Sequence, residues 1–472
     1  MFGTDAAERV DEKSLLRWRK RNSYYYGWLD RIYRFVVRPN CRVLHVGCEC
    51  GDLLAAVKPS YGVGVDENAA AIELARRRFA NLKFYTADPH QLELDEKFDY
   101  VLICNSIGRW RDIQQVLERI HPLTTEGTRI VITYYNYLWE GVLWLGAFLR
   151  IRRPYPYQNW LPPEDIKNLL SLAGFDVIRS SSYIILPKRV PPFTTLCNYL
   201  LSLLPGFRLL NMVSLVVARP TAAVQRDEDL SVSVIVPCKN ERGNIEDVIK
   251  RIPQMGRQTE IIFVDGNSTD GTPEEIERQI RKHPERKITL ISQGDGVGKG
   301  DAVRKGFAAA KGDVLVIQDA DLTAPPEDLP KFFRALRDGK GEFINGSRLV
   351  YPMEKQAMRL LNLLGNKFFG SLFGWLLGQR FRDTLCGTKM ISRKNYELIA
   401  ANRSYFGDFD PFGDFDLIFG AVKQNLKVVE VPVTYRARIY GSTNISRFRH
   451  GWLLLKMSWV AFKKIKWLGR TR

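Results

Sequence analysis

Apolar runs and helix-period segments alternate along the chain in two separate series. The first series opens with CRVLHVGC at 41–48 and the second with VSVIVPC at 232–238. In both, further apolar runs are separated by segments of helical spacing, a pattern that predicts α/β domains with parallel sheets. A polar stretch without periodicity lies between the series. The predicted division is a first domain at 1–220, a linker at 221–230, a second domain at 231–445 and an amphipathic C-terminal helix at 446–472.

Acidic residues follow three apolar runs of the second series. The run SVSVIVPC leads into a loop with Pro237 and Glu241, and TEIIFVD ends at Asp265 before a polar turn. The run DVLVIQDAD ends in Asp319 and Asp321. Acids that follow strands in this way are typical of nucleotide-binding turns, although a single Asp-x-Asp is a common sequence.

The two aspartates of the third run predict a metal site. Carboxylates at i and i+2 of a regular strand point to the same face of the sheet. Because Pro325 and Pro326 stop further pairing, the chain turns here and both acids can reach one point beyond the sheet. Mg²⁺ or Mn²⁺ prefers oxygen ligands and typically combines one or two carboxylates with substrate phosphates. Asp319 and Asp321 are therefore predicted to hold a nucleoside diphosphate through a cation; the alternative is a solvated acidic turn.

A glycine-bearing turn follows the first strand of the first series. The strand runs into GCECGDLLAAV, where Gly47 and Gly51 let the backbone approach a ligand closely. A second strand ends at Asp66, which can accept hydrogen bonds from both hydroxyls of a ribose, and Asp88 follows beside an expected adenine edge. The pattern predicts a nucleoside pocket in the first domain.

Charge and aromatic content indicate which partners the surface attracts. The chain has 70 Lys and Arg against 52 Asp and Glu, a formal charge of +18, together with 10 Trp and 25 Phe. Such a surface attracts nucleic acid, anionic lipid or phosphorylated substrates. No RNA-binding motif is present, so nucleic acid is not an expected partner. The seven cysteines lack the spacing of a zinc site or a disulfide framework and predict free thiols in a reducing cytoplasm.

No stretch of the sequence offers the ~18 uncharged apolar residues of a membrane span. The segment 446–472 mixes tryptophans with lysines and predicts a helix at a lipid headgroup layer, or else an ordinary packing helix with snorkelling lysines. Residues 186–218 are either a helix and a closing strand of the first domain or a helix that lies on the membrane. Residues 357–381 carry apolar stripes that are typical of a core helix.

The second half resembles the family 2 glycosyltransferases of the dolichol-phosphate mannose synthase kind over residues 231–445. The matching segments are VIVPCKNERGNI, VDGNSTDGT, DADLTAPPEDL, INGSRL, DTLCGTKMISR and YRARIYGSTN, in family order. The resemblance implies an A-type glycosyltransferase fold, a GDP- or UDP-linked sugar donor, a divalent metal and inversion at the anomeric carbon. The chain departs from the family pattern at Gly266 and Thr323, where the family has an acid and a glutamine.

The resemblance also implies roles for individual residues. Donor binding is expected from Pro237, Glu241, Asp265, Arg348 and the helix-start cation Lys299, and the acceptor side from Lys389, Arg438, Asp414 and Asp416. A polyprenyl phosphate acceptor is already largely ionised near neutral pH, so it needs cations to hold it. A sugar hydroxyl would instead require an aspartate to take its proton. The alternative for the acids at 408–416 is a solvated loop.

The first half resembles class I S-adenosylmethionine-dependent methyltransferases over roughly 38–185, with a Rossmann-like fold. The family loop reads acid-x-Gly-x-Gly-x-Gly, but here the acid is His45 and the middle glycine is Glu49. The bulk of Glu49 is expected to obstruct the methionine end of the cofactor. The resemblance allows S-adenosylmethionine as a cofactor, and the alternative is a scaffold that binds it poorly.

Three functions follow in order of support. The first is an inverting, metal-dependent transfer of a hexose from a nucleotide sugar to a polyprenyl phosphate at the cytoplasmic membrane face, with peripheral association to anionic lipid. The second is a bifunctional enzyme that also methylates the glycan or lipid intermediate. The third is a basic RNA-binding protein or RNA methyltransferase, which would show a steep salt dependence of RNA affinity.

Overall fold

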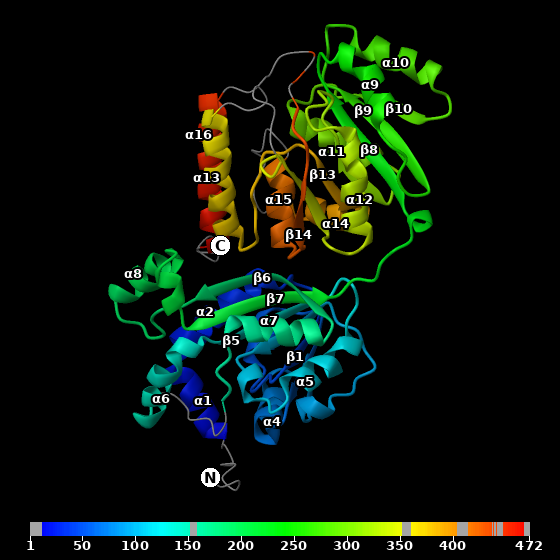
Figure 1. Cartoon of the computed structure of the whole chain (residues 1–472). Coiled ribbons are helices and arrows are strands. Elements are labelled where there is room, and N and C mark those ends of the chain that lie inside the picture. Colours follow the sequence, from blue (N-terminus) through cyan, green and yellow to red (C-terminus); the bar gives the residue numbers. More distant parts are fainter. Residues whose placement is uncertain are drawn as a thin grey trace. The chain divides into compact units, whose positions relative to one another are not determined.

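A computed structural model of the chain describes residues 12–151, 158–351, 360–403, 414–436, 438, 440 and 447–466. These residues form two compact units, of which the first ends at Thr221 and the second extends from Ala222 to Lys466 (Figure 1). Each unit has its own sheet and its own buried apolar core. The predicted α/β class of both halves is confirmed.

The first unit is built on a seven-stranded sheet with the order β3-β2-β1-β4-β5-β7-β6. Strands β1 to β5 run parallel, whereas β7 is antiparallel to both β5 and β6. One apolar cluster lies on each face of the sheet, so the central strands are buried on both sides. The strands are β1 Arg42–Val46, β2 Tyr61–Asp66, β3 Lys83–Thr86, β4 Tyr100–Cys104, β5 Arg129–Tyr135, β6 Phe175–Tyr183 and β7 Val213–Pro220.

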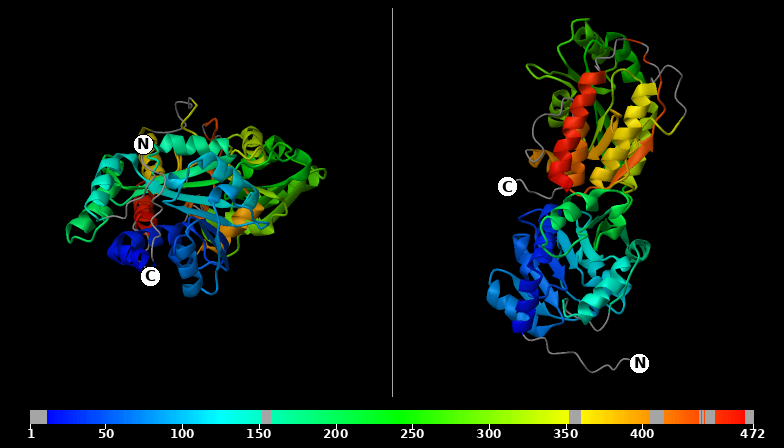
Figure 2. Two further views of the ribbon diagram at one scale, coloured as in Figure 1. Left: turned by 90° about the horizontal axis from the view of Figure 1, so that it is seen from below. Right: turned by 90° about the vertical axis from the view of Figure 1, so that its left-hand side faces the viewer.

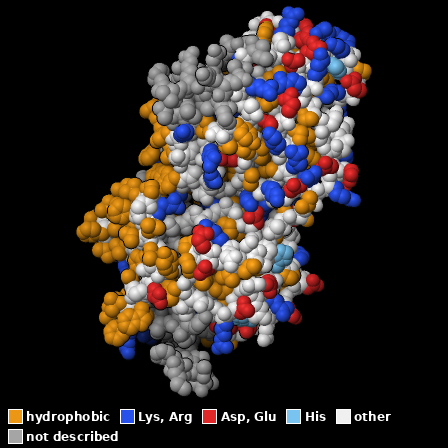
Figure 3. Space-filling view, in the orientation of Figure 1, with side chains coloured by type: hydrophobic (Ala, Val, Ile, Leu, Met, Phe, Trp, Pro, Cys, Tyr) orange, Lys and Arg blue, Asp and Glu red, His pale blue; other side chains and the backbone are white. Residues whose placement is uncertain are grey.

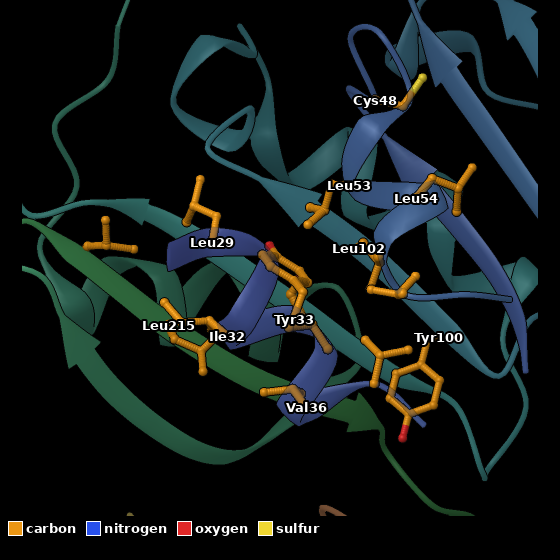
Figure 4. Packing of buried hydrophobic residues seen from close by; sticks show 14 of the residues in the cluster. Leu29, Ile32, Tyr33, Val36, Cys48, Leu53, Leu54, Tyr100, Leu102 and Leu215 are labelled. Atoms are coloured by element: carbon orange, nitrogen blue, oxygen red, sulfur yellow. The ribbon is translucent and has the colours of Figure 1, made fainter. Parts of the chain in front are cut away.

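Helix α2 shows how the sequence pattern builds the first core. Its apolar residues Leu29, Ile32, Tyr33 and Val36 recur at helical spacing and face the sheet, where Leu215 lies among them (Figure 4). The buried Tyr33 hydroxyl donates to the backbone oxygen of Ile103 in β4 at a distance of 3.0 Å, so this buried hydroxyl has a hydrogen-bond partner. The helices of this unit are α1 Glu12–Arg21, α2 Ser23–Val36, α3 Asp52–Ala56, α4 Ala69–Arg78, α5 Ile113–Ile120, α6 Glu140–Phe148, α7 Pro163–Leu172 and α8 Phe193–Tyr199.

The second unit also has a seven-stranded sheet, with the order β10-β9-β8-β11-β13-β12-β14. Strands β10, β9, β8 and β11 are parallel, β13 is antiparallel to β11 and β12, and β12 is parallel to β14. Strand β8 is almost entirely buried, as its continuous apolar run predicts. The strands are β8 Ser231–Cys238, β9 Gln258–Asp265, β10 Lys287–Ser292, β11 Val314–Ile317, β12 Phe343–Ser347, β13 Lys389–Ser392 and β14 Val428–Pro432.

The helices of the second unit include a long apolar one, α13, that contacts the end of the described chain. Helices α13 and α16 lie side by side (Figure 2). The Trp375 ring of α13 stacks on Phe462, which follows α16, at a centroid distance of 6.0 Å. The helices are α9 Ile245–Arg251, α10 Thr272–Lys282, α11 Lys299–Ala309, α12 Leu329–Arg337, α13 Leu360–Leu377, α14 Arg393–Ala401, α15 Asp414–Lys423 and α16 Arg447–Ala461, followed by a π-helical turn at Phe462–Lys466.

The fold bears on two expectations of the sequence analysis. The segment 186–218 forms the short helix α8 and runs into β7, as the closing-strand interpretation predicts, and contact of this segment with a membrane stays a prediction. In the part of the chain that the structure describes, no helix is long and apolar enough to cross a bilayer. All seven cysteines lie in this part and none forms a disulfide.

Candidate active site

The sheet of the second unit has a topological switch point between β8 and β11. From β8 the chain continues to β9 and β10 on one side, and it returns to β11 on the other side. A crevice opens where loops leave two adjacent strands in opposite directions, and ligands of open α/β sheets bind there. Glu241 follows β8, Asp265 ends β9, and Asp319 and Asp321 follow β11, so the fold brings these predicted residues to one edge. Pro237 lies within β8, opposite Val264 of β9.

Asp319 lies against a cation from the start of α11. The distance from Lys299 Nζ to Asp319 Oδ1 is 2.5 Å. Burial raises the pKa of the Asp319 carboxyl, but three cations, Lys299, Lys389 and Arg348, bring it below its ordinary value, so the group is ionised at neutral pH. Gly387 permits this approach, because a Cβ there would collide with Asp319 Oδ2 and lie 2.6 Å from Lys299 Nζ.

The chain turns sharply after the second aspartate, as the sequence predicts. Leu322 has a φ of +56°, a left-handed conformation in which a strand cannot continue. The buried Gln318 donates from Nε2 to Ala324 O at 2.8 Å and closes the turn. Thr323 donates from its backbone N and its Oγ1 to Asp321 Oδ1, at 3.1 and 2.9 Å. Where the family has a glutamine, Thr323 therefore orients the second aspartate.

Arg438 connects two acids from different loops. It donates from Nη2 to Asp321 Oδ2 at 2.5 Å and from Nη1 to Glu241 Oε1 at 3.2 Å. Glu241 Oε2 accepts a further hydrogen bond from Asn244 Nδ2 at 2.6 Å. Burial raises the pKa of the Glu241 carboxyl, and Arg438 opposes that shift. The segment after β14 thus meets the loop after β8 at the β11 turn.

Asp265 offers an acceptor that the described residues leave unused. Its side chain is 6% exposed, and its Oδ2 accepts a hydrogen bond from Ser268 N at 3.1 Å. Its Oδ1 is buried and has no hydrogen-bond partner among the described residues. A buried polar atom without a partner costs about 1–3 kcal/mol, a cost that a ligand N–H would remove. Nucleobases carry such donors, so the geometry is compatible with the predicted base contact.

Arg348 and Lys389 are both engaged by the protein itself. Arg348 forms a bidentate pair with the fully buried Asp383, with Nε–Oδ2 and Nη2–Oδ1 distances of 2.7 and 2.8 Å. Lys389 is 1% exposed and donates from Nζ to Cys386 O. Both cations lower the pKa of Asp319, so they act on the site as buried charges. Direct contacts of either residue with a substrate stay predictions.

The acidic residues expected on the acceptor side are described only in part. Asp416, on α15, accepts a hydrogen bond from Arg403 Nε at 2.7 Å. Asp414 is the first residue of α15, and its side chain lies outside the described residues, as do all of 404–413. The sequence analysis missed Arg403, because it lies in no motif and its partner Asp416 is 13 positions away. Gly387 could have been inferred, because it is the glycine of the DTLCGTK motif.

The oxygen donors of this site fit a hard divalent cation. Asp319 and Asp321 supply carboxylate oxygens, which Mg²⁺ and Mn²⁺ prefer. Within the described ranges no three His, Cys, Asp or Glu side chains are gathered as a metal site. The two carboxylates suit a cation whose remaining ligands are substrate phosphates and water.

The glycine turn of the first unit has the backbone that the sequence predicts. Gly47 and Gly51 have φ values of +73° and +77°, and a Cβ at Gly47 would lie 2.5 Å from the Ser106 Cβ. Between them, Glu49 has a left-handed φ of +47° and donates from its backbone N to Asp66 Oδ2 at 2.9 Å.

The two acids predicted to bind a nucleoside differ in exposure. Asp66 is 5% exposed, and its other oxygen accepts from Asn68 N at 2.9 Å. Burial raises the pKa of its carboxyl. Asp88 is an exposed cap whose Oδ1 accepts from His90 N and contacts the imidazole Nδ1. Both carboxylates are therefore already used by neighbouring backbone.

The residues of this turn do not fit S-adenosylmethionine. The cavity beside Gly47 and Glu49 is about 40 Å³, whereas pockets for small molecules occupy ~300–1,000 Å³. The Glu49 carboxylate lies 3.7 Å from Arg109 Nη1 across the same cavity. Asp66 and Asp88 line neither this cavity nor the larger one next to it. Glu49 lines this small cavity, and the obstruction expected from it stays a prediction.

Comparisons with known proteins agree with this division. Residues 233–398 match the family model described as glycosyl transferase family 2, and residues 44–130 match one described as a methyltransferase domain. The chain therefore carries a methyltransferase-type domain followed by a family 2 glycosyltransferase domain, as the sequence resemblances indicated.

Individual relatives cover only part of the chain. A dolichol-phosphate mannosyltransferase of Pyrococcus furiosus is 32% identical over 240 residues, 48% of this chain and 64% of the relative. The glycosyltransferase AglJ of Haloferax volcanii is 29% identical over 225 residues, 48% of this chain and 69% of the relative. A SAM-dependent methyltransferase of Thermotoga maritima aligns in structure with 45% of this chain and 97% of its own, at 15% identity and a TM-score of 0.36.

Proposed function

We propose that the second unit transfers a hexose from a nucleoside diphosphate sugar to a polyprenyl phosphate, with inversion at the anomeric carbon. The observation that carries the proposal is the convergence of Asp265, Asp319, Asp321 and Arg438 on one switch-point crevice. The dolichol-phosphate mannosyltransferase of Pyrococcus furiosus, whose name states a dolichol phosphate and a mannosyl group, supports this acceptor class.

Asp319 and Asp321 would hold Mg²⁺ or Mn²⁺ in this site. When bound, the cation offsets the negative charge that builds on the departing diphosphate. Lys299 supplies a second positive charge next to Asp319, at 2.5 Å, and so helps to hold the same phosphates. Asp265 orients the donor through its unused Oδ1, which is placed to accept from a nucleobase of a GDP- or UDP-linked sugar.

The acceptor side needs positive charge rather than a base. A polyprenyl phosphate is mostly dianionic near neutral pH, because the second pKa of a phosphomonoester is about 6. Arg438 is the cation that reaches the crevice, and the buried Lys389 adds to the positive field. Asp416, paired with Arg403, orients this side and is not required to remove a proton. Asp414 is proposed for the same side from its position at the start of α15.

Helix α16 supports an approach to the anionic membrane surface. Trp452 and Trp459 are 73% and 52% exposed, and Lys456 lies between them in the sequence. The opposite side of the helix is buried through Leu454 and Met457, so α16 is both a packing helix and a carrier of exposed aromatic residues. Tryptophan beside lysine is typical of helices that lie at the headgroup layer.

A donor screen tests the proposal. The full chain is incubated with nucleotide sugars, Mg²⁺ or Mn²⁺ and a short polyprenyl phosphate, and the product mass is measured. We expect one donor to yield a glycosyl-phosphoprenol and Asp321→Ala to abolish the product. The exposed Asp247, on α9, provides the matched control, and Asp247→Ala is expected to retain activity. Undiminished transfer by Asp321→Ala would contradict the metal assignment.

A further inference from the structure

The first unit contains an apolar cavity that the proposed transfer does not use. The cavity is about 320 Å³, which falls in the range of ~300–1,000 Å³ occupied by small-molecule sites. Its walls come from α1, α2, α6, the strand ends near Tyr135 and Met212, and the end of the glycine turn at Glu49, Cys50 and Asp52, all within one unit. The side chains that define it include Leu15, Trp18, Tyr25, Trp139, Val142 and Leu143.

Helix α6 forms one wall and contributes only Leu143 to the core. Its sequence, EGVLWLGAF, has one charged residue, at the first position. Val142 and Leu145 line the cavity and are 56% and 49% exposed, while Trp144 and Phe148 are 67% and 72% exposed. Figure 3 shows hydrophobic side chains gathered over the region where α6 and α8 lie in Figure 1. A helix that is apolar on all sides indicates a partner that covers it.

Positive charge without a carboxylate partner lies at the rim. Lys188 lines the cavity and donates from Nζ to Asn22 Oδ1 at 2.7 Å and to Arg21 O at 3.2 Å. Arg21 donates from Nη1 to the backbone oxygen of Arg150 at 2.8 Å. Within the described ranges, neither Lys188 nor Arg21 forms an ion pair with an acid, whereas Arg19, which also lines the cavity, pairs with Asp52.

We propose that this cavity binds an amphiphile with a single anionic head and a long apolar tail. The head lies against Lys188 and Arg21, whose charges it neutralises, and the tail lies between α1 and α6. An adenosyl group is a poor match for these walls, because Leu, Val and Trp side chains leave its polar atoms without partners. A fatty acid and a prenyl phosphate share this chemistry. The site lies in the first unit and does not depend on the proposed transfer activity.

Binding to the full chain is measured with a dansyl-labelled undecanoic acid, displaced by octanoate, decanoate, dodecanoate and hexadecanoate. Each methylene that enters the cavity should tighten binding about fourfold, since burial of one CH₂ contributes ~0.8 kcal/mol. The increase should stop once the tail exceeds the cavity. Equal affinity across the series, or displacement by S-adenosylmethionine, would overturn the proposal.

The head group and its source are tested by two further competitors. The methyl ester of dodecanoate should compete at least tenfold more weakly than dodecanoate, because it has no charge to place at Lys188. Farnesyl phosphate and dodecanoate are compared at equal concentration, and the stronger competitor identifies the source of the anionic head. If the ester and the acid compete equally, the assignment of Lys188 and Arg21 is wrong.

Two pairs of variants locate the site. Val142→Trp fills the cavity and should abolish binding, whereas Phe148→Trp puts the same indole on α6 away from the cavity and should not. Lys188→Gln should weaken binding of the acid tenfold or more without affecting the ester, and Arg189→Gln, at the exposed neighbour, should leave both unchanged. Far-ultraviolet circular dichroism of each variant confirms folding. Unchanged affinity in both Val142→Trp and Lys188→Gln would exclude this cavity.

Discussion

Arg438 donates from Nη2 to Asp321 Oδ2 across 2.5 Å, so a cation of the chain itself lies against a carboxylate that we assign to the metal. The same guanidinium also contacts Glu241. A divalent cation that binds Asp321 must therefore share or displace this contact. The arrangement links metal binding to the position of Arg438, which becomes available to an anionic acceptor when the metal takes over Asp321.

Replacement of Arg438 should separate metal binding from transfer. In Arg438→Gln, Asp321 loses its competing cation, so Mn²⁺ binding without nucleotide should tighten. Transfer should fall about 10–100-fold, because a hydrogen bond to a charged group contributes ~1.5–3 kcal/mol. Calorimetry with Mn²⁺ and a product assay measure the two effects. Arg436→Gln, two residues earlier, should change neither, and weaker Mn²⁺ binding by Arg438→Gln would contradict the competition.

A methyl group at Gly387 should disable the site while the fold persists. The added Cβ of Gly387→Ala collides with Asp319 Oδ2 and crowds Lys299 Nζ, so the carboxylate must move. A displacement of about 1 Å in a reacting site can reduce turnover ~100-fold. The control is Gly374→Ala on α13, where the nearest atom would lie at 3.4 Å. Steady-state kinetics and melting temperatures are measured for both variants and the natural chain. A loss of turnover in Gly387→Ala at an unchanged melting temperature would support this account, and full activity would refute it.

Glu49 should determine whether the first unit binds S-adenosylmethionine. Its left-handed φ of +47° suits glycine, and its side chain occupies the space beside Gly47. Glu49→Gly should therefore bind the cofactor measurably by calorimetry, whereas the natural chain should not. Glu126→Gly, at an exposed turn, serves as the control for added backbone freedom. Micromolar binding by the natural chain would instead favour the bifunctional enzyme.

His45 should make the first unit less stable in mild acid. The ring is 2% exposed, neither nitrogen has a hydrogen-bond partner among the described residues, and burial together with Arg19 and Arg109 lowers its pKa to about 3. Below pH ~6.5 the unfolded chain binds a proton that the folded chain does not, so the free energy of unfolding falls by up to about 1.4 kcal/mol per pH unit.

The comparison of His45→Leu with the natural chain isolates this effect in urea unfolding between pH 7 and 5. Asp30, Glu49 and Asp66 lie nearby, and Asp66, whose pKa burial raises, has the opposite pH dependence. These acids are present in both proteins, so their contributions cancel in the difference. If the free energy of unfolding changes equally with pH in the two proteins, His45 takes up its proton in the folded state as well.

The sequence predicts the strands and the edge at which the acids meet, because both depend on local patterns. Continuous apolar runs identify β8, β9 and β11, and Glu241, Asp265 and Asp319 lie at or shortly after the carboxyl ends of these strands. The double proline and the polar turn after Asp321 indicate that the strand stops, although the left-handed Leu322 that reverses the chain has no sequence signal.

Contacts between distant segments are not available to the same reasoning. The Arg438–Glu241 pair joins positions 197 residues apart, and the Arg348–Asp383 pair buries a motif arginine that the resemblance places near phosphates. The apolar cavity beside α6 is built from five separate stretches of chain, and only the glycine turn among them has a motif. Such features follow from tertiary packing, which local periodicity does not specify.

The most direct test of the central claim is electron paramagnetic resonance of Mn²⁺ with the full chain and GDP or UDP. The account predicts that one nucleotide promotes binding of a single Mn²⁺ and that Asp321→Asn weakens this binding about tenfold or more. If Asp321→Asn binds Mn²⁺ and nucleotide as tightly as the natural chain, the cation lies elsewhere and the assignment of the crevice is wrong.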